Sequence, residues 1–475
     1  MVFSSTVFLF LFLPAILIVY FIVPKSLKNI VLLIGSLFFY AWGEPKFVLV
    51  MILSIIINYV LGIIVDINRN NKLKVKLILG FMVVVNLLIL GFFKYTNFIV
   101  ENINSLLNTN FANPEIPLPI GISFFTFQAM SYVIDVYRND GKVQRNPFDL
   151  ALYISLFPQL IAGPIVRYQT VAEQITKRFS NLPRILYGVR RFIIGLGKKM
   201  ILANNCGFVA DQIFSQNPAD MTTGLAWIGI ISYSLQIYFD FSAYSDMAIG
   251  LGKILGFDFL ENFNYPYISK SITEFWRRWH ISLSSWFRDY LYIPLGGNRR
   301  GRFNTYRNLF IVWLATGIWH GASWTFIAWG VYYGLLIMIE KLFLGKLLKS
   351  IPKPISHIYT LILVMIGWVF FRADNFSYAF SYLGTMFGFN GNGIWDIDAQ
   401  FYFYQNGIIL GIAIIGSTPL LMKIFEAIQS KSQTSTLSNV FLNQIGINTY
   451  IMLIFILSIS YTVADTFNPF IYFRF

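Results

Sequence analysis

Long runs of apolar residues recur along the chain and are separated by shorter polar stretches. A helix that crosses the hydrocarbon core of a bilayer needs about 20 mostly apolar residues. The chain is 56% hydrophobic and 12% charged, whereas a soluble domain carries roughly 25% charged residues. We therefore expect an all-α, polytopic membrane protein that forms a single domain over residues 1–475. Candidate spans are Phe3–Val23, Ile30–Trp42, Phe47–Val65, Leu77–Phe93, Ile120–Val136, Ala226–Phe241, Thr360–Phe371, Phe401–Leu421 and Asn443–Val463.

Other segments are too interrupted or too polar for a plain span. Leu150–Val166 contains prolines and a glycine, and Asn308–Phe343 is predicted to form two helices with a break near Gly321–Ser323. Arg184–Met200 has basic residues at both ends and is typical of an interfacial helix. Ile272–Leu291 has helix length but is polar, so we expect it in the cytoplasmic interface or lining a funnel. The total is about 11 membrane helices, with re-entrant or interfacial helices around a central funnel.

The charges of the loops predict an orientation. The loop at residues 66–76 carries four basic residues against one aspartate, whereas residues 390–400 are acidic. Because basic loops stay in the cytoplasm, both chain termini are predicted to lie outside. The first apolar run lacks a basic region before it and a small-residue cleavage site, so it is expected to be a retained helix.

Several functional classes are disfavoured by composition. The net charge of +14 is dispersed between apolar spans, as expected of cytoplasmic loops and not of a nucleic-acid-binding module. Cys206 is the single cysteine, which excludes an intrachain disulfide and a cysteine-based metal cluster. No His, Cys, Asp or Glu stands at ligand spacing from His320, so we expect neither a metal site nor a permanently bound cofactor.

The segment from Lys270 to Arg307 is the most basic part of the chain, with eight basic residues against two acidic ones. One interpretation is a solvated face that binds lipid headgroups. The other is a docking surface for an anionic donor, because arginine clusters are the usual means of binding phosphates. The candidate donor-binding residues are Arg277, Arg278, Arg299, Arg300 and Arg302.

His320 lies in the apolar stretch "WLATGIWHGASWTFIAWG" and is one of three histidines. An ionisable residue inside a membrane helix is a candidate for function, and imidazole can act as a general base near neutral pH. Gly321, Ala322 and Ser323 follow it and leave room for a substrate. The alternative is a histidine that is hydrogen-bonded to a neighbouring helix.

The sequence singles out two further groups of polar residues. Asp240 and Asp246 either hold water and orient a histidine, or mark the end of a helix and cap its neighbours. His357 follows a proline at a helix entrance and is expected to be structural.

Several motifs together resemble the membrane-bound O-acyltransferase family, and within it the bacterial subgroup of alginate O-acetylation proteins. They are "LPIGISFFTFQAMSYVIDVYR", "FPQLIAGPIVR", "QIYFDFSAYSDMAIGLGKILGFDFLENFNYPY", "TEFWRRWHISLSSWFRDYLYIPLGGNR" and "GIWHGASWTFIAWGVYYG". The resemblance covers essentially the whole chain.

The resemblance implies a multi-pass enzyme of the bacterial cell membrane. It makes His320 the family's catalytic histidine and His280 its second characteristic histidine. It implies that acetyl-CoA in the cytoplasm is the acyl donor. The acceptor side would be an extracytoplasmic SGNH-like, esterase-like partner that acetylates a cell-envelope polysaccharide. The alternatives are a D-alanyl transfer protein of teichoic acid modification, and a transporter without covalent chemistry.

The final stretch "FNPFIYFRF" holds five aromatic residues and Ile471. A chain terminus is usually polar and frayed, so this one is expected to fold back into an apolar groove. It either anchors the chain at the lipid interface or enters the mouth of the funnel, where Tyr472 would be a candidate acyl relay.

Overall fold

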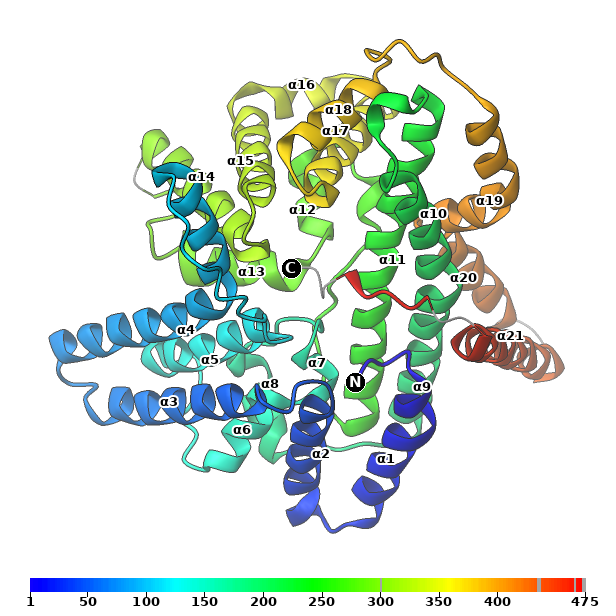
Figure 1. Cartoon of the computed structure of the whole chain (residues 1–475). Helices are drawn as coiled ribbons and strands as arrows, with labels where there is room; N and C mark the ends of the chain where they lie inside the picture. Colours follow the sequence, from blue (N-terminus) through cyan, green and yellow to red (C-terminus); the bar gives the residue numbers. More distant parts are fainter. Residues whose placement is uncertain (300, 434–436, 465–466, 472–475) are drawn as a thin grey trace. The chain divides into compact units, whose positions relative to one another are not determined.

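The computed structural model describes residues 1–299, 301–433, 437–464 and 467–471. Every regular element in these ranges is a helix, which confirms the all-α prediction (Figure 1). The chain divides into two compact units, one of Met1–Phe192 with Met247–Leu260 and one of Ile193–Asp246 with Glu261–Phe475. The single domain and the central funnel expected from the sequence stay predictions.

The first unit is built from antiparallel and broken helices. Asn58 on α3 and Asn86 on α4 donate to each other's side-chain oxygen at 3.0 Å, which joins two apolar helices by amide hydrogen bonds. The helix α5 is buried on almost all sides. The elements are η1 (Phe8–Phe12), α1 (Leu13–Ile22), η2 (Lys25–Leu27), α2 (Lys28–Gly43), α3 (Val48–Ile67), α4 (Lys72–Leu107), α5 (Ile122–Arg138), α6 (Pro147–Ser155), α7 (Phe157–Leu160), α8 (Tyr168–Thr176) and most of α9 (Leu182–Gly197).

The second unit contains both candidate histidines, His280 of the basic segment and His320 of the apolar stretch. Its elements are η3 (Lys198–Ala203), α10 (Asn204–Phe214), η4 (Pro218–Asp220), most of α11 (Thr223–Leu255), η5 (Pro266–Ile268), α12 (Ile272–Arg278), α13 (Ile281–Phe287), η6 (Arg288–Tyr292), α14 (Gly301–His320), α15 (Trp324–Ile339), η7 (Glu340–Leu344), α16 (Gly345–Ser350), α17 (Lys353–Arg372), α18 (Phe376–Met386), α19 (Ile397–Gly416), α20 (Leu420–Gln433) and α21 (Leu437–Ala464).

Within the described residues, six helices are long and apolar enough to cross a membrane. They are Lys25–Gly43, Val48–Ile67, Lys72–Leu107, Trp324–Ser350, Lys353–Arg372 and Ile445–Ala464. Their outward faces carry many exposed large apolar side chains, as lipid contact requires. The number of about 11 membrane helices stays a prediction.

Three predicted segments differ from the structure. The fourth span was expected to end at Phe93, but α4 continues to Leu107 because its polar residues bond to the following loop, as Asn97 does with Ile116 at 3.0 Å. The segment Ile272–Leu291 is not continuous, because the backbone turns at His280 between α12 and α13. The span expected at Ala226–Phe241 lies in the N-terminal half of the longer helix α11.

The break predicted at Gly321–Ser323 is confirmed and separates α14 from α15, which pack side by side (Figure 1). The two helices meet at Gly317 and Gly330, where an added Cβ on Gly330 would lie 2.5 Å from the carbonyl oxygen of Trp313. At the break, the Ser323 hydroxyl accepts the Thr325 amide at 3.3 Å and begins the second helix. This hairpin brings the end of α14 back onto the aromatic face of α15.

Candidate active site

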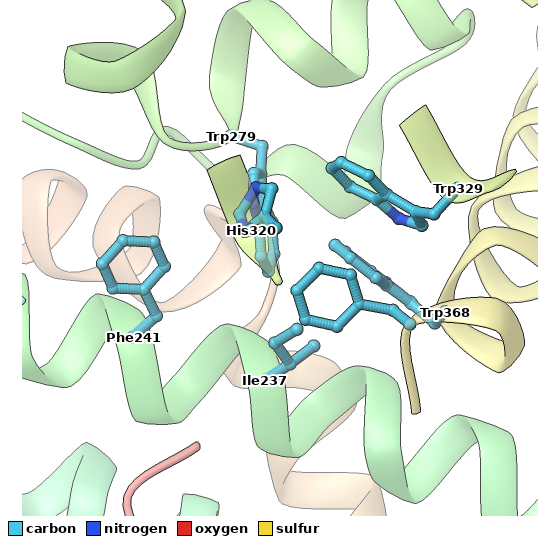
Figure 2. Close-up of a pocket in the computed structure, with 7 residues that line it drawn as sticks. Ile237, Phe241, Trp279, His320, Trp329 and Trp368 are labelled. Atoms are coloured by element: carbon cyan, nitrogen blue, oxygen red, sulfur yellow. The ribbon is translucent and has the colours of Figure 1, made fainter. Parts of the chain in front are cut away.

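A pocket in the second unit is lined by His320 and six apolar or aromatic side chains (Figure 2). The walls come from α11, from the corner between α12 and α13, from the α14–α15 hairpin and from α17. The pocket has room for about one water molecule. The lining residues are Ile237, Phe241, Trp279, His320, Trp329, Trp368 and Phe371.

His320 is the last residue of α14, and its side chain is buried. Its ring centroid lies 4.8 Å from that of Trp329 and 5.2 Å from that of Phe371, both at steep angles. Gly321 is required beside it, because an added Cβ would lie 2.2 Å from Cδ2 of Phe326. The sequence "HG" therefore allows the chain to turn directly after a histidine that projects into the pocket.

His280 occupies the corner between α12 and α13, in the left-handed region at φ 45°. Its Nδ1 lies 3.1 Å from Oδ1 of Asn262, and only 1% of the residue is exposed. Burial lowers the pKa of the His280 imidazole to about 3. The ring is therefore neutral at physiological pH.

The two histidines are brought to the same aromatic cluster from different elements. The Trp319 ring centroid is 5.0 Å from that of His320 and 6.4 Å from that of His280. The Phe241 ring, which lines the pocket, meets His280 edge-on at 4.6 Å. His280 thus lies behind the pocket wall, whereas His320 lines the pocket itself.

The candidate arginines are spread over two segments of the second unit. Arg277 on α12 and Arg299 and Arg302 near the start of α14 are exposed. Arg278 is half-buried and forms an ion pair with Glu274 at 3.0 Å, and it also donates to the Asn264 carbonyl. Arg300 lies outside the described residues.

Asp240 and Asp246 lie inside α11, so the interpretation that they mark a helix end is wrong. Each pairs with a lysine of η3 at 2.6 Å: Asp240 with Lys199, and Asp246 with Lys198. These ion pairs supply opposite charges, which is why α11 can continue through both carboxylates.

Residues 467–471 fold back onto the ion pair of Asp240 and Lys199, whereas the apolar groove expected for the whole tail stays a prediction. Asp240 accepts the Ile471 amide at 2.7 Å, and Lys199 donates to the Pro469 carbonyl. Phe470 is buried against Tyr244, with ring centroids 5.2 Å apart. Figure 1 shows this segment in red beside α11. Tyr472 lies outside the described residues.

Sequence reasoning missed the walls of the pocket that come from α11 and α17, and it missed Asn262 and Lys199. Aromatic residues on an apolar helix carry no signal of their own, and Asn262 lies in a loop without periodicity. His357 lies 3.1 Å from the Ser269 carbonyl, which agrees with a structural role. Among the described residues, no group of three or more His, Cys, Asp or Glu side chains could hold a metal.

Comparison with known proteins adds the following. Residues 140–381 match the model of the MBOAT, membrane-bound O-acyltransferase family. A probable alginate O-acetylase AlgI of Pseudomonas putida is 43% identical over the full length of both chains. A peptidoglycan O-acetyltransferase of Helicobacter pylori is 38% identical over 82% of this chain and 80% of its own. A teichoic acid D-alanyltransferase of Bacillus subtilis is 30% identical over 52% of this chain and 65% of its own.

Proposed function

This chain belongs to the membrane-bound O-acyltransferase family, and from that premise we propose that it moves acetyl groups from acetyl-CoA toward a cell-envelope polysaccharide. It is an integral membrane protein and an acyltransferase. The acetyl group and the polysaccharide acceptor are supported by the names of relatives that align over four fifths or more of this chain.

The observation that carries the chemistry is the position of His320 at the pocket. The acceptor oxygen attacks the thioester carbonyl while His320 takes the hydroxyl proton, so that a C–O bond forms and the C–S bond breaks. The proton then passes from His320 to the leaving thiolate of CoA. General-base catalysis of this kind contributes roughly 10²–10⁴-fold to rate.

The surroundings of His320 shield the reacting groups from water. The rings of Trp329 and Phe371 exclude water from the imidazole, and this limits hydrolysis of the thioester. Because the pocket holds about one water molecule, thioester entry requires some of its lining side chains to move.

The donor end of the reaction is assigned to the cytoplasmic basic segment. The exposed guanidinium groups of Arg277, Arg299 and Arg302 are available to the phosphates of acetyl-CoA. The charges of the loops support a cytoplasmic position for this segment and a position of both termini outside the bacterial cell membrane. The same arginines would also suit lipid headgroups, and the salt dependence of donor KM separates the two roles.

The acceptor end is assigned to the opposite side of the membrane. There an SGNH-like partner takes the acetyl group and passes it to the polysaccharide. Tyr472 is the proposed relay: its phenol oxygen forms an ester as the C–S bond breaks, and the phenol proton passes through His320 to the thiolate of CoA. The partner's hydroxyl then attacks this ester, the bond from the acetyl carbon to the phenol oxygen breaks, and the phenol regains the proton of the attacking hydroxyl. The bonds of residues 467–471 to Lys199 and Asp240 support a tail that is held in the second unit. Tyr472→Phe is expected to block polysaccharide acetylation and leave membrane insertion unchanged, whereas normal acetylation would leave the tail with an anchoring role alone.

The test of the proposed function uses the purified full chain with acetyl-CoA and measures release of the CoA thiol. Because the partner is absent, water is the acceptor, and the turnover is slow hydrolysis. Turnover is expected for the wild type and for His357→Ala, the matched control histidine that contacts a backbone carbonyl. It is expected to be lost in His320→Ala. Equal turnover by His320→Ala would contradict the role of His320.

A second candidate donor is a D-alanyl thioester on a carrier protein, because a D-alanyltransferase aligns with half of this chain. It is less favoured because the acetyltransferases align with more of the chain at higher identity. Turnover of the D-alanyl carrier but not of acetyl-CoA would overturn the acetyl assignment.

A further inference from the structure

Asn262 lies in the loop after α11 and is fully buried. Its side-chain oxygen accepts the backbone amide of Ser282 at 3.1 Å and the Ser282 hydroxyl at 2.9 Å. The same oxygen lies 3.1 Å from Nδ1 of His280. Three polar groups of the α12–α13 corner therefore converge on one amide oxygen.

The orientation of this amide is settled by the backbone of Ser282. A backbone N–H can only donate, so the Asn262 atom that faces it must be the carbonyl oxygen and not the NH₂ group. An amide oxygen can only accept, so the His280 nitrogen beside it must carry a hydrogen. In a neutral imidazole the other nitrogen, Nε2, is then the acceptor.

The backbone of the same loop holds the corner in place. The Ile281 amide donates to the Asn262 carbonyl at 3.0 Å, and the Asn264 amide donates to the Arg278 carbonyl at 2.9 Å. These bonds lie on either side of His280, which has a left-handed backbone at φ 45°. Such a conformation is unfavourable in a residue other than glycine and needs surrounding structure to hold it.

Nε2 of His280 is buried, and no hydrogen-bond partner for it occurs among the described residues. A buried acceptor without a partner is unfavourable, so it is typically kept for a water molecule or for a ligand. The Phe241 ring contacts the same imidazole and also lines the pocket of His320.

We propose that Asn262 is a positioning residue that locks His280 as the Nδ1–H tautomer, so that the buried Nε2 keeps a lone pair for an N–H or O–H group that reaches it when the pocket's lining side chains move. The hydrogen on Nδ1 follows from the hydrogen bonds, and the lone pair on Nε2 follows from the neutral state of the buried ring, whereas the use of this tautomer in turnover rests on the proposed function. Asn262 acts through His280 and does not itself touch the substrate.

The test is nitrogen NMR of the full chain labelled with ¹⁵N-histidine, in which protonated and unprotonated ring nitrogens have distinct shifts. The chain has three histidines, so His280→Gln and His357→Gln are sufficient to assign the signals. At neutral pH the wild type is expected to show a protonated Nδ1 and an unprotonated Nε2 at His280. A protonated Nε2 with an unprotonated Nδ1 would overturn the proposal, whatever the activity.

Variants separate the tautomer from general structure. Asn262→Leu is expected to mix the two tautomers at His280 and to lower acetyl-CoA turnover about 10-fold, the size of one lost buried hydrogen bond. Asn308→Leu removes another fully buried amide of this unit, which bonds to backbone carbonyls, and is expected to leave the His280 signals unchanged. Ser282→Ala keeps the backbone donor and is expected to keep the tautomer.

The outcomes distinguish this inference from the proposed function. An unchanged tautomer in a folded Asn262→Leu variant would overturn the role of Asn262, and so would wild-type turnover after the tautomer is lost. If Asn262→Leu does not fold, the wild-type and Ser282→Ala spectra still decide the tautomer. Absence of acetyl-CoA turnover in the wild type would count against the proposed function and not against the tautomer.

Discussion

His320 ends a long helix among aromatic rings, whereas His280 stands at a corner between two short helices and is held by an asparagine. The His320 ring is flanked by Trp319, Trp329 and Phe371 and lines the pocket. The His280 ring lies behind Phe241, with Nδ1 bonded to Asn262. One histidine is placed mainly by packing and the other by hydrogen bonds.

The difference indicates that the two histidines have different roles in the reaction. A base must change its protonation state during each turnover, so its surroundings have to accept both forms. The bonds around His280 favour one neutral tautomer, and burial lowers its pKa to about 3. His280 is therefore suited to accept a hydrogen bond, and His320 is suited to take a proton.

The largest expected effect comes from removing the base. His320→Ala should reduce acetyl-CoA turnover by roughly 10²–10⁴-fold, the usual size of a general-base contribution. The variant should stay folded, and its melting temperature separates the loss of the base from the loss of packing by the buried ring. Turnover and thermal unfolding are measured on the same preparation, with His357→Ala as the control. A decrease in turnover that merely follows a loss of folded protein would remove the argument for a base.

The second effect tests the supporting role of His280. His280→Ala should reduce turnover about 10- to 100-fold, as expected when one or two buried hydrogen bonds are lost. The decrease should be smaller than that of His320→Ala. Steady-state rates over a range of acetyl-CoA concentrations measure both variants. If the His280 variant is the more damaged one, the two roles have been assigned in the wrong order.

The site could be predicted from the sequence where the signal was local. An ionisable residue in an apolar run marked His320, and the small residues Gly321–Ser323 marked the break after it. The corner at His280 was not predicted, because it depends on Asn262, a partner 18 residues earlier in the chain. The length of α11 was also missed, because Lys199 pairs with Asp240 from another helix. Long-range partners of this kind leave no trace in periodicity or composition.

The third effect concerns stability and not turnover. The pKa of His280 is about 3 in the folded chain, whereas that of an ordinary histidine is 6.5, so below pH 6.5 the unfolded chain binds a proton that the folded chain does not. The stability is therefore fully present above pH 6.5 and decreases as the pH falls, by ~1.4 kcal/mol per unit.

Thermal unfolding at pH 7.5 and pH 5.5 checks this effect. His280→Asn removes the titrating group and keeps a residue that tolerates the left-handed backbone. Between these two pH values, the wild type should lose ~1.4 kcal/mol more stability than the variant does. If the two proteins lose the same stability between these pH values, His280 titrates in the folded chain as it does in water. A neutral state of His280 would then no longer distinguish it from His320.

The smallest expected effect shows which of the two regions binds acetyl-CoA. Arg277 and Arg278 directly precede the His280 corner, but only Arg277 is exposed, because Arg278 is engaged with Glu274 and Asn264. Exposed charge pairs contribute roughly 0.2–1 kcal/mol each and are screened by salt. The double change Arg277→Gln and Arg299→Gln should therefore raise the KM for acetyl-CoA several-fold at low salt. Added salt should raise the wild-type KM toward that of the variant and leave kcat unchanged.

Arg278→Gln is the matched control, and it should alter stability more than KM because its guanidinium holds the loop of Asn264. If neither salt nor these substitutions change the KM for acetyl-CoA, the basic segment binds lipid headgroups. The α12–α13 corner then has no role in binding the donor.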